Sequence, residues 1–178
     1  MKKSLVAVAS GILVWLTFLL SGCTGAPEGI EPVKNFELDR YLGKWYEIAR
    51  LDHSFERGLS RVTAEYTMQS DGGVKVINRG YSIKKEKWKE AEGKAYFVGA
   101  ADTGHLKVSF FGPFYGAYVI YELDQENYQY ALVSGPNRSY LWILARSPSL
   151  EQQIQDKLIA KAAALGFDTS KLIYVEHQ

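Results

Sequence analysis

Short segments in which apolar and polar residues alternate, or which are rich in Val, Ile, Tyr and Phe, follow one another from residue 43 to residue 146. Alternation with a period of two is typical of β-strands that bury one face. The pattern predicts strands at residues 43–51, 61–68, 73–81, 91–98, 105–111, 117–124, 128–134 and 140–146. No helical pattern separates them, and Asp71-Gly72-Gly73 is a strong hairpin signal. We therefore predict an all-β fold, an eight-stranded up-and-down antiparallel β-barrel, which closes on itself and leaves no exposed edge.

The pattern changes to a helical period after the last predicted strand. Apolar residues recur there at spacings of four or three, which is one face of a helix: Leu150, Ile154, Leu158, Ala162 and Leu165. Ser147 or Ser149 is available as the N-cap, and Gly166 as the stop. We predict one C-terminal α-helix packed on the barrel wall, followed by a short final strand within residues 172–175. The polar face of this helix is expected to be solvated and carries Glu151, Gln155 and Lys161.

The first 22 residues are predicted to be a signal peptide. Two lysines precede an apolar run from Leu5 to Leu20, and small residues follow it. A transmembrane anchor is the alternative, but the run is shorter than the about 20 residues that a membrane-spanning helix needs. Residues 23–36 contain several glycines and prolines and no periodic pattern, which predicts a tether. The folded domain is then expected over residues 37–178.

The composition suits one globular domain without a nucleic-acid partner. The chain has 178 residues, of which 47% are hydrophobic, and its formal net charge is +1, so it has no excess of positive charge for a phosphate backbone. Its one cysteine, Cys23, directly follows the signal sequence. One cysteine cannot form a disulfide within the chain. We therefore predict that Cys23 carries lipid and anchors the protein to a membrane, rather than being a buried side chain or a nucleophile.

The side chains predicted to face the barrel interior favour a cavity. If Trp45 points inward, Glu47, Ala49 and Leu51 share its face. Several inward positions on later strands are Ala or Val, which leave space that larger side chains would fill in a packed barrel. The candidate ligand-binding residues are Tyr66, Val76, Asn78, Phe97, Val108, Phe110, Val119, Tyr121, Val133, Tyr140 and Trp142. Such a cavity suits an amphiphile with its chain inside and its head group near the mouth, and it equally suits a porphyrin or another flat hydrophobic molecule.

An enzyme that acts on a lipid or another hydrophobic substrate inside the barrel is the alternative to a binding protein. His53, His105 and His177 lack the spacing of metal ligands and are predicted to be solvated surface residues. The sequence has no glycine-serine-glycine elbow of a hydrolase. Glu47 is the one carboxylate predicted to face inward, as a hydrogen-bonded structural group near the barrel floor. We therefore expect no catalytic residue, no metal and no cofactor.

Several stretches of the sequence resemble the lipocalin family. They are Gly43-Lys44-Trp45-Tyr46, the loop at residues 55–58, Ala64-Glu65-Tyr66, VSFFGPFYGAY at residues 108–118 and YLWILAR at residues 140–146. Together they are similar to the bacterial outer-membrane lipoprotein lipocalins of the apolipoprotein D-like branch, over about residues 36–177. Leu20-Ser21-Gly22-Cys23 also resembles the lipobox of bacterial lipoproteins, in which the cysteine is acylated, and Thr24 after it suggests the outer membrane.

This resemblance implies roles for particular residues. Gly43 lets the chain enter the barrel tightly, Trp45 caps its closed end, and Arg146 lies across the indole, so that these three residues are structural. The turn Gln125-Glu126-Asn127 departs from the Thr-Asp-Tyr that is usual in the family, which weakens that motif. The resemblance also implies a fatty acid or lysophospholipid ligand, a role in envelope lipid storage, transport or repair, and a lipid-anchored position on the periplasmic side of the outer membrane. The sequence leaves open whether the protein is a monomer or a homodimer.

Overall fold

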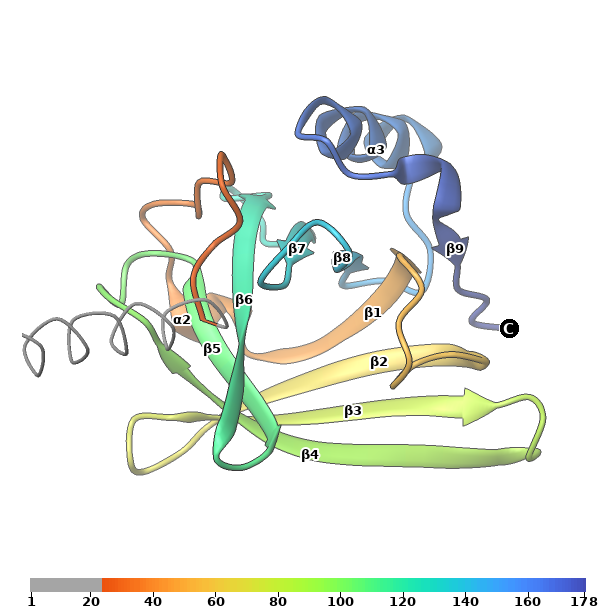
Figure 1. The fold of residues 1–178 in the computed structure, drawn as a ribbon, viewed down its shortest axis with the longest axis horizontal. Coiled ribbons are helices and arrows are strands. Elements are labelled where there is room, and N and C mark those ends of the chain that lie inside the picture. Colours follow the sequence, from red (N-terminus) through yellow and green to blue (C-terminus); the bar gives the residue numbers. More distant parts are fainter. Residues whose placement is uncertain (1–23) are drawn as a thin grey trace, which may run out of the picture.

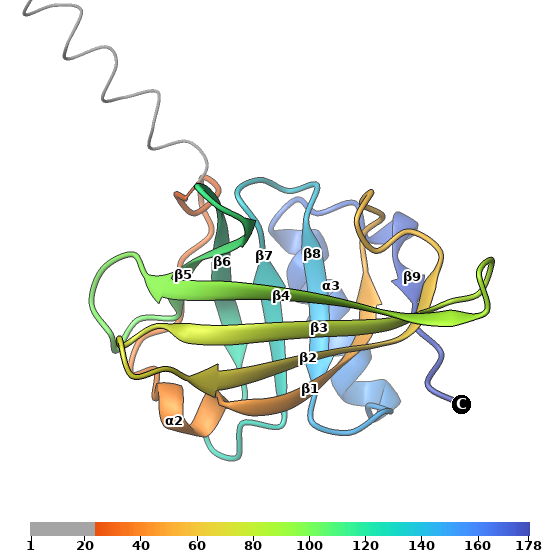
Figure 2. The same ribbon diagram turned by 90° about the horizontal axis from the view of Figure 1, so that it is seen from below.

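Antiparallel strands form a closed barrel, which Figures 1 and 2 show from two directions. The structure, a computed structural model, describes residues 24–178, so the predicted signal peptide and Cys23 lie outside the described residues. The barrel strands are β1 (Gly43–Arg50), β2 (Leu59–Met68), β3 (Val74–Ser82), β4 (Lys87–Phe97), β5 (His105–Phe111), β6 (Phe114–Leu123), β7 (Tyr130–Ser134) and β8 (Leu141–Ala145). Each pairs with its neighbours along the chain, and β1 closes the barrel by pairing with both β2 and β8. The predicted eight-stranded up-and-down barrel is confirmed.

The hairpin of β3 and β4 is longer than the sequence pattern predicts, and its tip projects beyond the barrel in Figure 2. β4 begins at Lys87 rather than at residue 91, because its pairing with β3 continues into charged residues that show no alternation. β4 pairs with β5 only from Lys94 to Phe97. The first half of β4 and the end of β5 therefore leave an unpaired stretch in the barrel wall. The other strands begin and end within three residues of the predicted positions.

Residues 24–36 lie along the barrel wall instead of forming a free tether. Ile30 and Phe36 are buried, and the backbone N–H of Val33 donates to the carbonyl of Ile120 at 2.9 Å. The described part of the predicted tether is therefore an ordered strap. The sequence pattern did not predict this strap, because single apolar residues in an aperiodic segment are also typical of a linker, and the wall on which they pack is formed by distant strands.

Two apolar cores lie on the two sides of the barrel wall. One fills the closed end of the barrel around Trp45, which is 0% exposed. The other lies between the wall and the helix α3 (Gln152–Ala164), where Leu158 and Ala162 are buried as the apolar stripe predicts. Strands β6, β7 and β8 contribute side chains to both cores. These strands are consequently apolar on both faces.

The ends of α3 follow the sequence prediction only in part. Its N-cap position is Glu151, without a side-chain capping hydrogen bond, so the predicted cap at Ser147 or Ser149 is wrong; bends at residues 146–149 come before the helix begins. Gly166, with a φ of +86°, ends the helix as predicted. Lys161 forms an ion pair with Glu122 of β6, so the polar face is not merely solvated.

The chain ends outside the barrel. The 3-10 helix η1 (Thr169–Lys171) is followed by the short strand β9 (Ile173–Tyr174), which pairs with β1. This is the short final strand that was predicted within residues 172–175. The described strand pairings and the two cores join segments throughout residues 24–178, so we expect this segment to fold on its own. None of its helices has the length and apolar character needed to cross a membrane.

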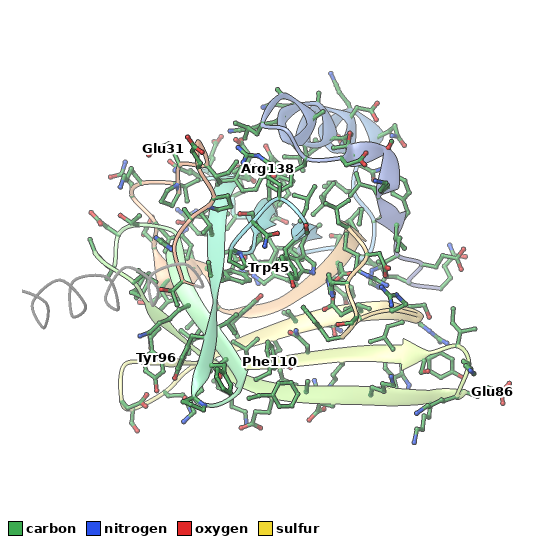
Figure 3. All side chains as sticks on the ribbon, in the orientation of Figure 1. Glu31, Trp45, Glu86, Tyr96, Phe110 and Arg138 are labelled. Atoms are coloured by element: carbon green, nitrogen blue, oxygen red, sulfur yellow. The ribbon has the colours of Figure 1, made fainter. Side chains whose placement is uncertain are left out.

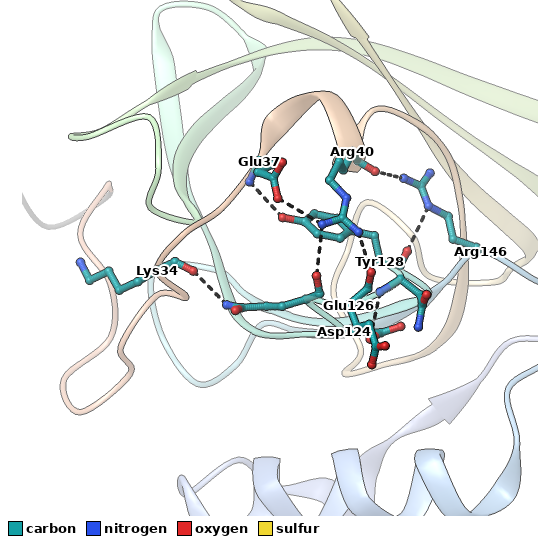
Figure 4. A network of polar contacts seen from close by, with 9 residues as sticks. Lys34, Glu37, Arg40, Asp124, Glu126, Tyr128 and Arg146 are labelled. Atoms are coloured by element: carbon teal, nitrogen blue, oxygen red, sulfur yellow. Dashed lines mark hydrogen bonds and ion pairs between the residues drawn. The ribbon is translucent and has the colours of Figure 1, made fainter.

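The closed end of the barrel is held by Arg146. Its guanidinium carbon lies 4.1 Å from the ring centroid of Trp45, the arrangement that the lipocalin resemblance implies. The same guanidinium donates to the backbone carbonyls of Arg40 and Tyr128, which Figure 4 shows, and to that of Lys44. Gly43 has a φ of +90°, which favours glycine. Arg146 therefore joins three separate segments to the tryptophan.

The turn that departs from the family pattern is held through its backbone. Arg40, in the short helix α2 (Leu38–Tyr41), donates to the carbonyl of Gln125 at 3.2 Å and to that of Glu126 at 2.6 Å (Figure 4). The carboxylate of Asp124 accepts from the backbone N–H groups of Asn127 and Gln129. Because Arg40 binds carbonyls, the turn keeps these contacts without the side chains that are usual in the family.

Candidate ligand-binding cavity

The barrel encloses a cavity of about 260 Å³ with a mostly apolar lining. It lies between the closed end, which the side chains around Trp45 fill (Figure 3), and the loops at the mouth. Small side chains such as Ala64, Ala95 and Ala117 line it beside larger ones. The structure therefore contains the cavity that the small inward residues predict.

Most of the candidate ligand-binding residues line this cavity: Tyr66, Val76, Asn78, Val108, Phe110, Tyr140 and Trp142. Their role in binding stays a prediction. Asn78 has a special position among them, because its Oδ1 is buried without a hydrogen-bond partner in the described part of the protein. Buried polar atoms normally have partners. Asn78 thus offers an acceptor to a ligand.

Two candidates on β6 point the other way. Val119 and Tyr121 belong to the core beneath α3, and Tyr121 stacks on Phe167 with ring centroids 5.6 Å apart. The inward residues of this strand are Tyr118 and Ile120, one position away from the predicted ones. The prediction failed because β6 is apolar on both faces, so alternation does not tell inside from outside.

Two further candidates lie inside the barrel but do not line the cavity. Phe97 packs edge-on against Phe36, with ring centroids 6.2 Å apart, and Val133 is 0% exposed in the core around Trp45. Phe97 is part of the filled closed end, whereas Val133 pairs with Trp142 of β8 and is covered by the side chains of the core around it. Facing inward is therefore not enough to line the cavity, because position along the barrel axis also counts and a period-two pattern does not specify it.

A β-bulge in β1 changes which side chains enter the barrel. The register with β8 shifts between Glu47 and Ala49, so that Ala49 and Leu51 belong to the core beneath α3 rather than to the interior as predicted. Arg50 turns inward instead and is 1% exposed. Strict alternation places Arg50 on the outer face, so the sequence pattern did not identify it as an inward residue.

Arg50 and Glu47 form a buried ion pair. Arg50 Nη1 donates to Glu47 Oε1 at 2.6 Å, and Nη2 donates to the backbone carbonyls of Glu56 at 3.0 Å and Leu59 at 3.3 Å. Glu47 is hydrogen-bonded, as predicted, but its partner belongs to the mouth and not to the barrel floor. The pair therefore fixes the loop between β1 and β2 over the cavity.

Glu56 links this pair to aromatic side chains at the mouth. Its Oε2 accepts a hydrogen bond from Trp142 Nε1 at 3.1 Å and lies 2.8 Å from His53 Nε2. The ring of His53 lies against that of Phe55, with centroids 3.9 Å apart, and His53 is 6% exposed. We call Glu47, Arg50, His53 and Glu56 the mouth cluster. Glu47 and Glu56 of this cluster line the cavity, whereas Arg50 does not.

The prediction of solvated surface histidines is wrong. His53 is buried in the mouth cluster, while His105 Nε2 lies 2.8 Å from the carbonyl of Thr24 and His177 Nε2 lies 2.8 Å from that of Glu47. The contacts of His105 and His177 join segments that are far apart in sequence, and that of His53 forms only when the loop between β1 and β2 folds. Local sequence does not reveal such partners.

The two carboxyl groups of the mouth cluster shift in opposite directions. Burial raises the pKa of Glu47 well above its usual range, and the Glu56 carboxylate adds to this rise, while Arg50 opposes it only in part. Burial also disfavours the ionised form of Glu56, but contacts with His53, Trp142 and Arg50 together lower the pKa of Glu56. As the pH falls, Glu47 therefore takes up a proton before Glu56.

Three tyrosine hydroxyls form the inner polar part of the cavity lining. The hydroxyl of Tyr118 lies 2.8 Å from that of Tyr41 and 2.8 Å from that of Tyr66. Burial raises the pKa of all three phenols, so they stay neutral. Three O–H groups share two contacts, which leaves one hydrogen to donate to a ligand. Tyr41 and Tyr118 were missed, the first in a helix too short to predict and the second through the one-residue error on β6.

A second cavity, of about 360 Å³, adjoins the first at the unpaired stretch between β4 and β5. The two share Phe55, Glu56, Val62, Asn78 and Phe110 in their linings. The second cavity adds charged side chains, namely Lys89 and the ion pair of Arg79 with Glu90. Together the two cavities give apolar walls with polar groups at both ends. Within residues 24–178, no group of three or more His, Cys, Asp or Glu side chains is placed to hold a metal ion.

A closed antiparallel barrel with an apolar cavity and a helix on its wall is the architecture of β-barrel proteins that bind small hydrophobic ligands. The lipocalin-like domain model matches residues 36–177, and the chain belongs to this family. It is 63% identical to "Outer membrane lipoprotein Blc" of Vibrio cholerae, over 93% of this chain and 97% of that protein, and 52% identical to the protein of the same name from Escherichia coli K12, over 89% and 90%. Apolipoprotein D of Macaca fascicularis is 31% identical, over 94% and 96%.

The fold is similar to those of several solved structures. Insecticyanin from the tobacco hornworm Manduca sexta superposes with a TM-score of 0.68, at 24% identity, over 86% of this chain and 87% of that chain. Lobster apocrustacyanin A1 superposes with a TM-score of 0.63, at 22% identity, over 86% and 94%. At these identities the likeness shows the fold alone.

Proposed function

We propose that this protein is a lipid-anchored lipocalin of the outer membrane, facing the periplasm, which binds one single-chain amphiphile and stores or carries it in the cell envelope. The observation that carries the proposal is the apolar cavity with polar groups at its inner end and at its mouth. Its volume of about 260 Å³ lies just below the usual range for ligand sites, about 300–1,000 Å³. That size favours a slim acyl chain over a wide, flat ring system.

The charges at the mouth favour a lysophospholipid over a free fatty acid. The ionisable side chains that line the first cavity near the mouth are the carboxyl groups of Glu47 and Glu56. Glu56, whose pKa is lowered, stays ionised, so it repels a fatty-acid carboxylate and attracts an ammonium head group. Lys89 in the second cavity supplies positive charge for a phosphate, whereas Arg79 is already paired with Glu65 and Glu90. A zwitterionic head group therefore matches both cavities.

The location rests on the lipid anchor predicted at Cys23 and on the high-identity relatives that are named outer membrane lipoproteins. The described chain begins one residue later, and the carbonyl of Thr24 already contacts His105 of β5. An acyl group on Cys23 would thus hold the barrel close to the membrane surface.

Binding is tested by tryptophan fluorescence on the segment 24–178, with lysophosphatidylethanolamine and palmitate as probes. Trp142 lines the cavity, whereas Trp45 is fully buried at the closed end and Trp88 is 57% exposed on β4. We expect a saturable change that Trp142→Phe abolishes and Trp88→Phe leaves intact, with tighter binding of the lysophospholipid. Native mass spectrometry of the protein purified from its own membrane identifies the natural ligand.

A cavity-filling variant separates binding from unspecific adsorption. Val108→Trp places an indole in the cavity, where it should weaken binding, at a cost in stability of about 1–3 kcal/mol. Val98→Trp, at an exposed position near the closed end, is the matched control and should bind as the parent does. Equal binding by both variants would refute the barrel site. A probe lipid recovered hydrolysed or isomerised, in proportion to the protein, would instead support the enzyme alternative.

A further inference from the structure

Large apolar side chains are exposed around the mouth of the barrel. Phe55, Ile83, Phe111 and Phe114 are 55%, 65%, 80% and 79% exposed. Three of them, the phenylalanines, line the second cavity together, and the backbone N–H of Ile83 donates to Gly58 in the loop that carries Phe55. We call these four residues the apolar rim. A soluble protein rarely gathers such side chains at one end without a partner for them.

Positive charge lies beside the apolar rim. The tip of the β3–β4 hairpin carries Lys84, Lys85, Lys87 and Lys89, all exposed and none in an ion pair within the described part of the chain. Glu86 is the one acidic residue at the tip, which Figure 3 marks by its label. The whole chain has a formal net charge of only +1. These four lysines, the lysine hairpin, are therefore a local concentration of charge.

The apolar rim borders an opening in the side of the barrel. Gly93 is the last point of close approach between β4 and β5, since a Cβ there would lie 2.7 Å from the carbonyl oxygen of Ser109. Toward the mouth the two strands no longer pair, and the second cavity occupies this stretch. Phe110 lines both cavities (Figure 3). A chain entering here reaches the barrel interior without passing over the mouth loops.

We propose that the apolar rim and the lysine hairpin form a surface that docks the barrel mouth on a phospholipid bilayer, with the side opening turned toward the lipid. Aromatic side chains partition into the boundary between head groups and acyl chains, and nearby lysines attract anionic head groups. A protein partner would cover the rim equally well, but it would not explain why the rim surrounds the entrance of an apolar cavity. The docking surface is separate from the anchor predicted at Cys23 and goes beyond ligand binding inside the barrel.

The test uses the segment 24–178, which lacks the anchor, and sedimentation with vesicles. One set contains phosphatidylethanolamine with anionic phosphatidylglycerol, and the other contains phosphatidylcholine alone. Phe111→Ser/Phe114→Ser should lower the partition coefficient at least about tenfold on the anionic vesicles, because two aromatic rings leave the interface. Met68→Ser/Val98→Ser removes two apolar side chains that are 43% and 41% exposed at the other end of the barrel, and it should bind as the parent does.

A second variant tests the charge. Lys84→Gln/Lys85→Gln/Lys87→Gln should weaken binding to the anionic vesicles several-fold and leave the weaker binding to phosphatidylcholine unchanged. All substituted positions are exposed, so thermal unfolding should match that of the parent.

Three outcomes would overturn the proposal. The parent segment binds neither kind of vesicle, the rim and control variants lose binding equally, or the rim variant changes a dimer into a monomer in analytical ultracentrifugation while vesicle binding is unchanged. In the last case the rim is an interface between two copies of the chain. Vesicle docking can be measured even if the fluorescence titration shows no ligand binding. The proposal of ligand binding in the barrel and the proposal of docking on a bilayer can therefore be refuted independently.

Discussion

Replacing Arg50 with leucine tests whether the mouth cluster holds the entrance of the barrel together. The change leaves the carboxyl groups of Glu47 and Glu56 in a buried site without the guanidinium, and it removes the donor to the carbonyls of Glu56 and Leu59. Removal of one partner from a buried ion pair costs about 3–5 kcal/mol of the free energy of unfolding. Domains have total stabilities of about 5–15 kcal/mol. Arg50→Leu should therefore remove a large part of the stability at neutral pH.

The destabilisation caused by Arg50→Leu should depend on the presence of its ion-pair partner, Glu47. Glu47→Leu in the same chain removes the carboxyl group that Arg50→Leu leaves alone, so the double variant should be more stable than the sum of the single effects predicts, by about 2 kcal/mol or more. Arg57→Leu is the matched control, because Arg57 lies in the same loop and pairs with Asp52 at the surface, where its side chain is 66% exposed. It should leave the midpoint of urea unfolding close to that of the parent, because exposed ion pairs contribute little to stability.

The pH dependence follows from the raised pKa of Glu47. A raised pKa means that the folded state binds a proton more tightly than the unfolded state, so the contribution of Glu47 is most favourable below its ordinary pKa of about 4.3 and is lost as the pH rises through the folded value. Loss of Arg50 raises the pKa of Glu47 further. The loss of free energy of unfolding that Arg50→Leu causes should therefore become smaller as the pH is lowered from neutral toward 4.3. In a chain that also carries Glu47→Gln, this loss should no longer depend on pH.

The assay is urea unfolding of the segment 24–178, followed by far-ultraviolet circular dichroism at several pH values. The slope of the free energy against urea must stay constant for the comparison to hold. A cost of Arg50→Leu below about 1 kcal/mol at neutral pH would refute the reasoning. So would a cost that does not change with pH.

The remaining predictions concern the closed end, the side opening and the anchor. Trp45→Ala should cost about 3–5 kcal/mol and Arg146→Ala less, and a double-mutant cycle by urea unfolding should give a coupling energy of about 1 kcal/mol; a value near zero would contradict the contact. Gly93→Ala brings a methyl group to 2.7 Å from the carbonyl of Ser109 and should cost about 1–3 kcal/mol, whereas an unchanged melting temperature would show that the strands separate freely. Cys23→Ser should leave an unprocessed, unacylated precursor in cell fractionation, and a cleaved form that stays in the outer membrane would refute the anchor.

The sequence by itself determined the architecture of the barrel. Period-two alternation between short turns specified antiparallel strands, and the five-residue apolar stripe placed one helix on the wall. These features are local, because strand and helix geometry fix which side chains share a face within one element. For the same reason Trp142, Tyr140 and Val108, on strands or strand ends with a clear inward face, were placed correctly in the cavity lining.

Only the tertiary structure decided which residues form the polar parts of the site. A single bulge in β1 turned Arg50 inward and Ala49 outward, and β6, with both faces apolar, placed Tyr118 rather than Val119 inside. The folding of a loop over the mouth buried His53. In each case the deciding quantity is a register or a contact between distant segments. A shift of one residue in register exchanges the two faces of a strand, and the sequence of that strand alone does not contain the partner that sets it.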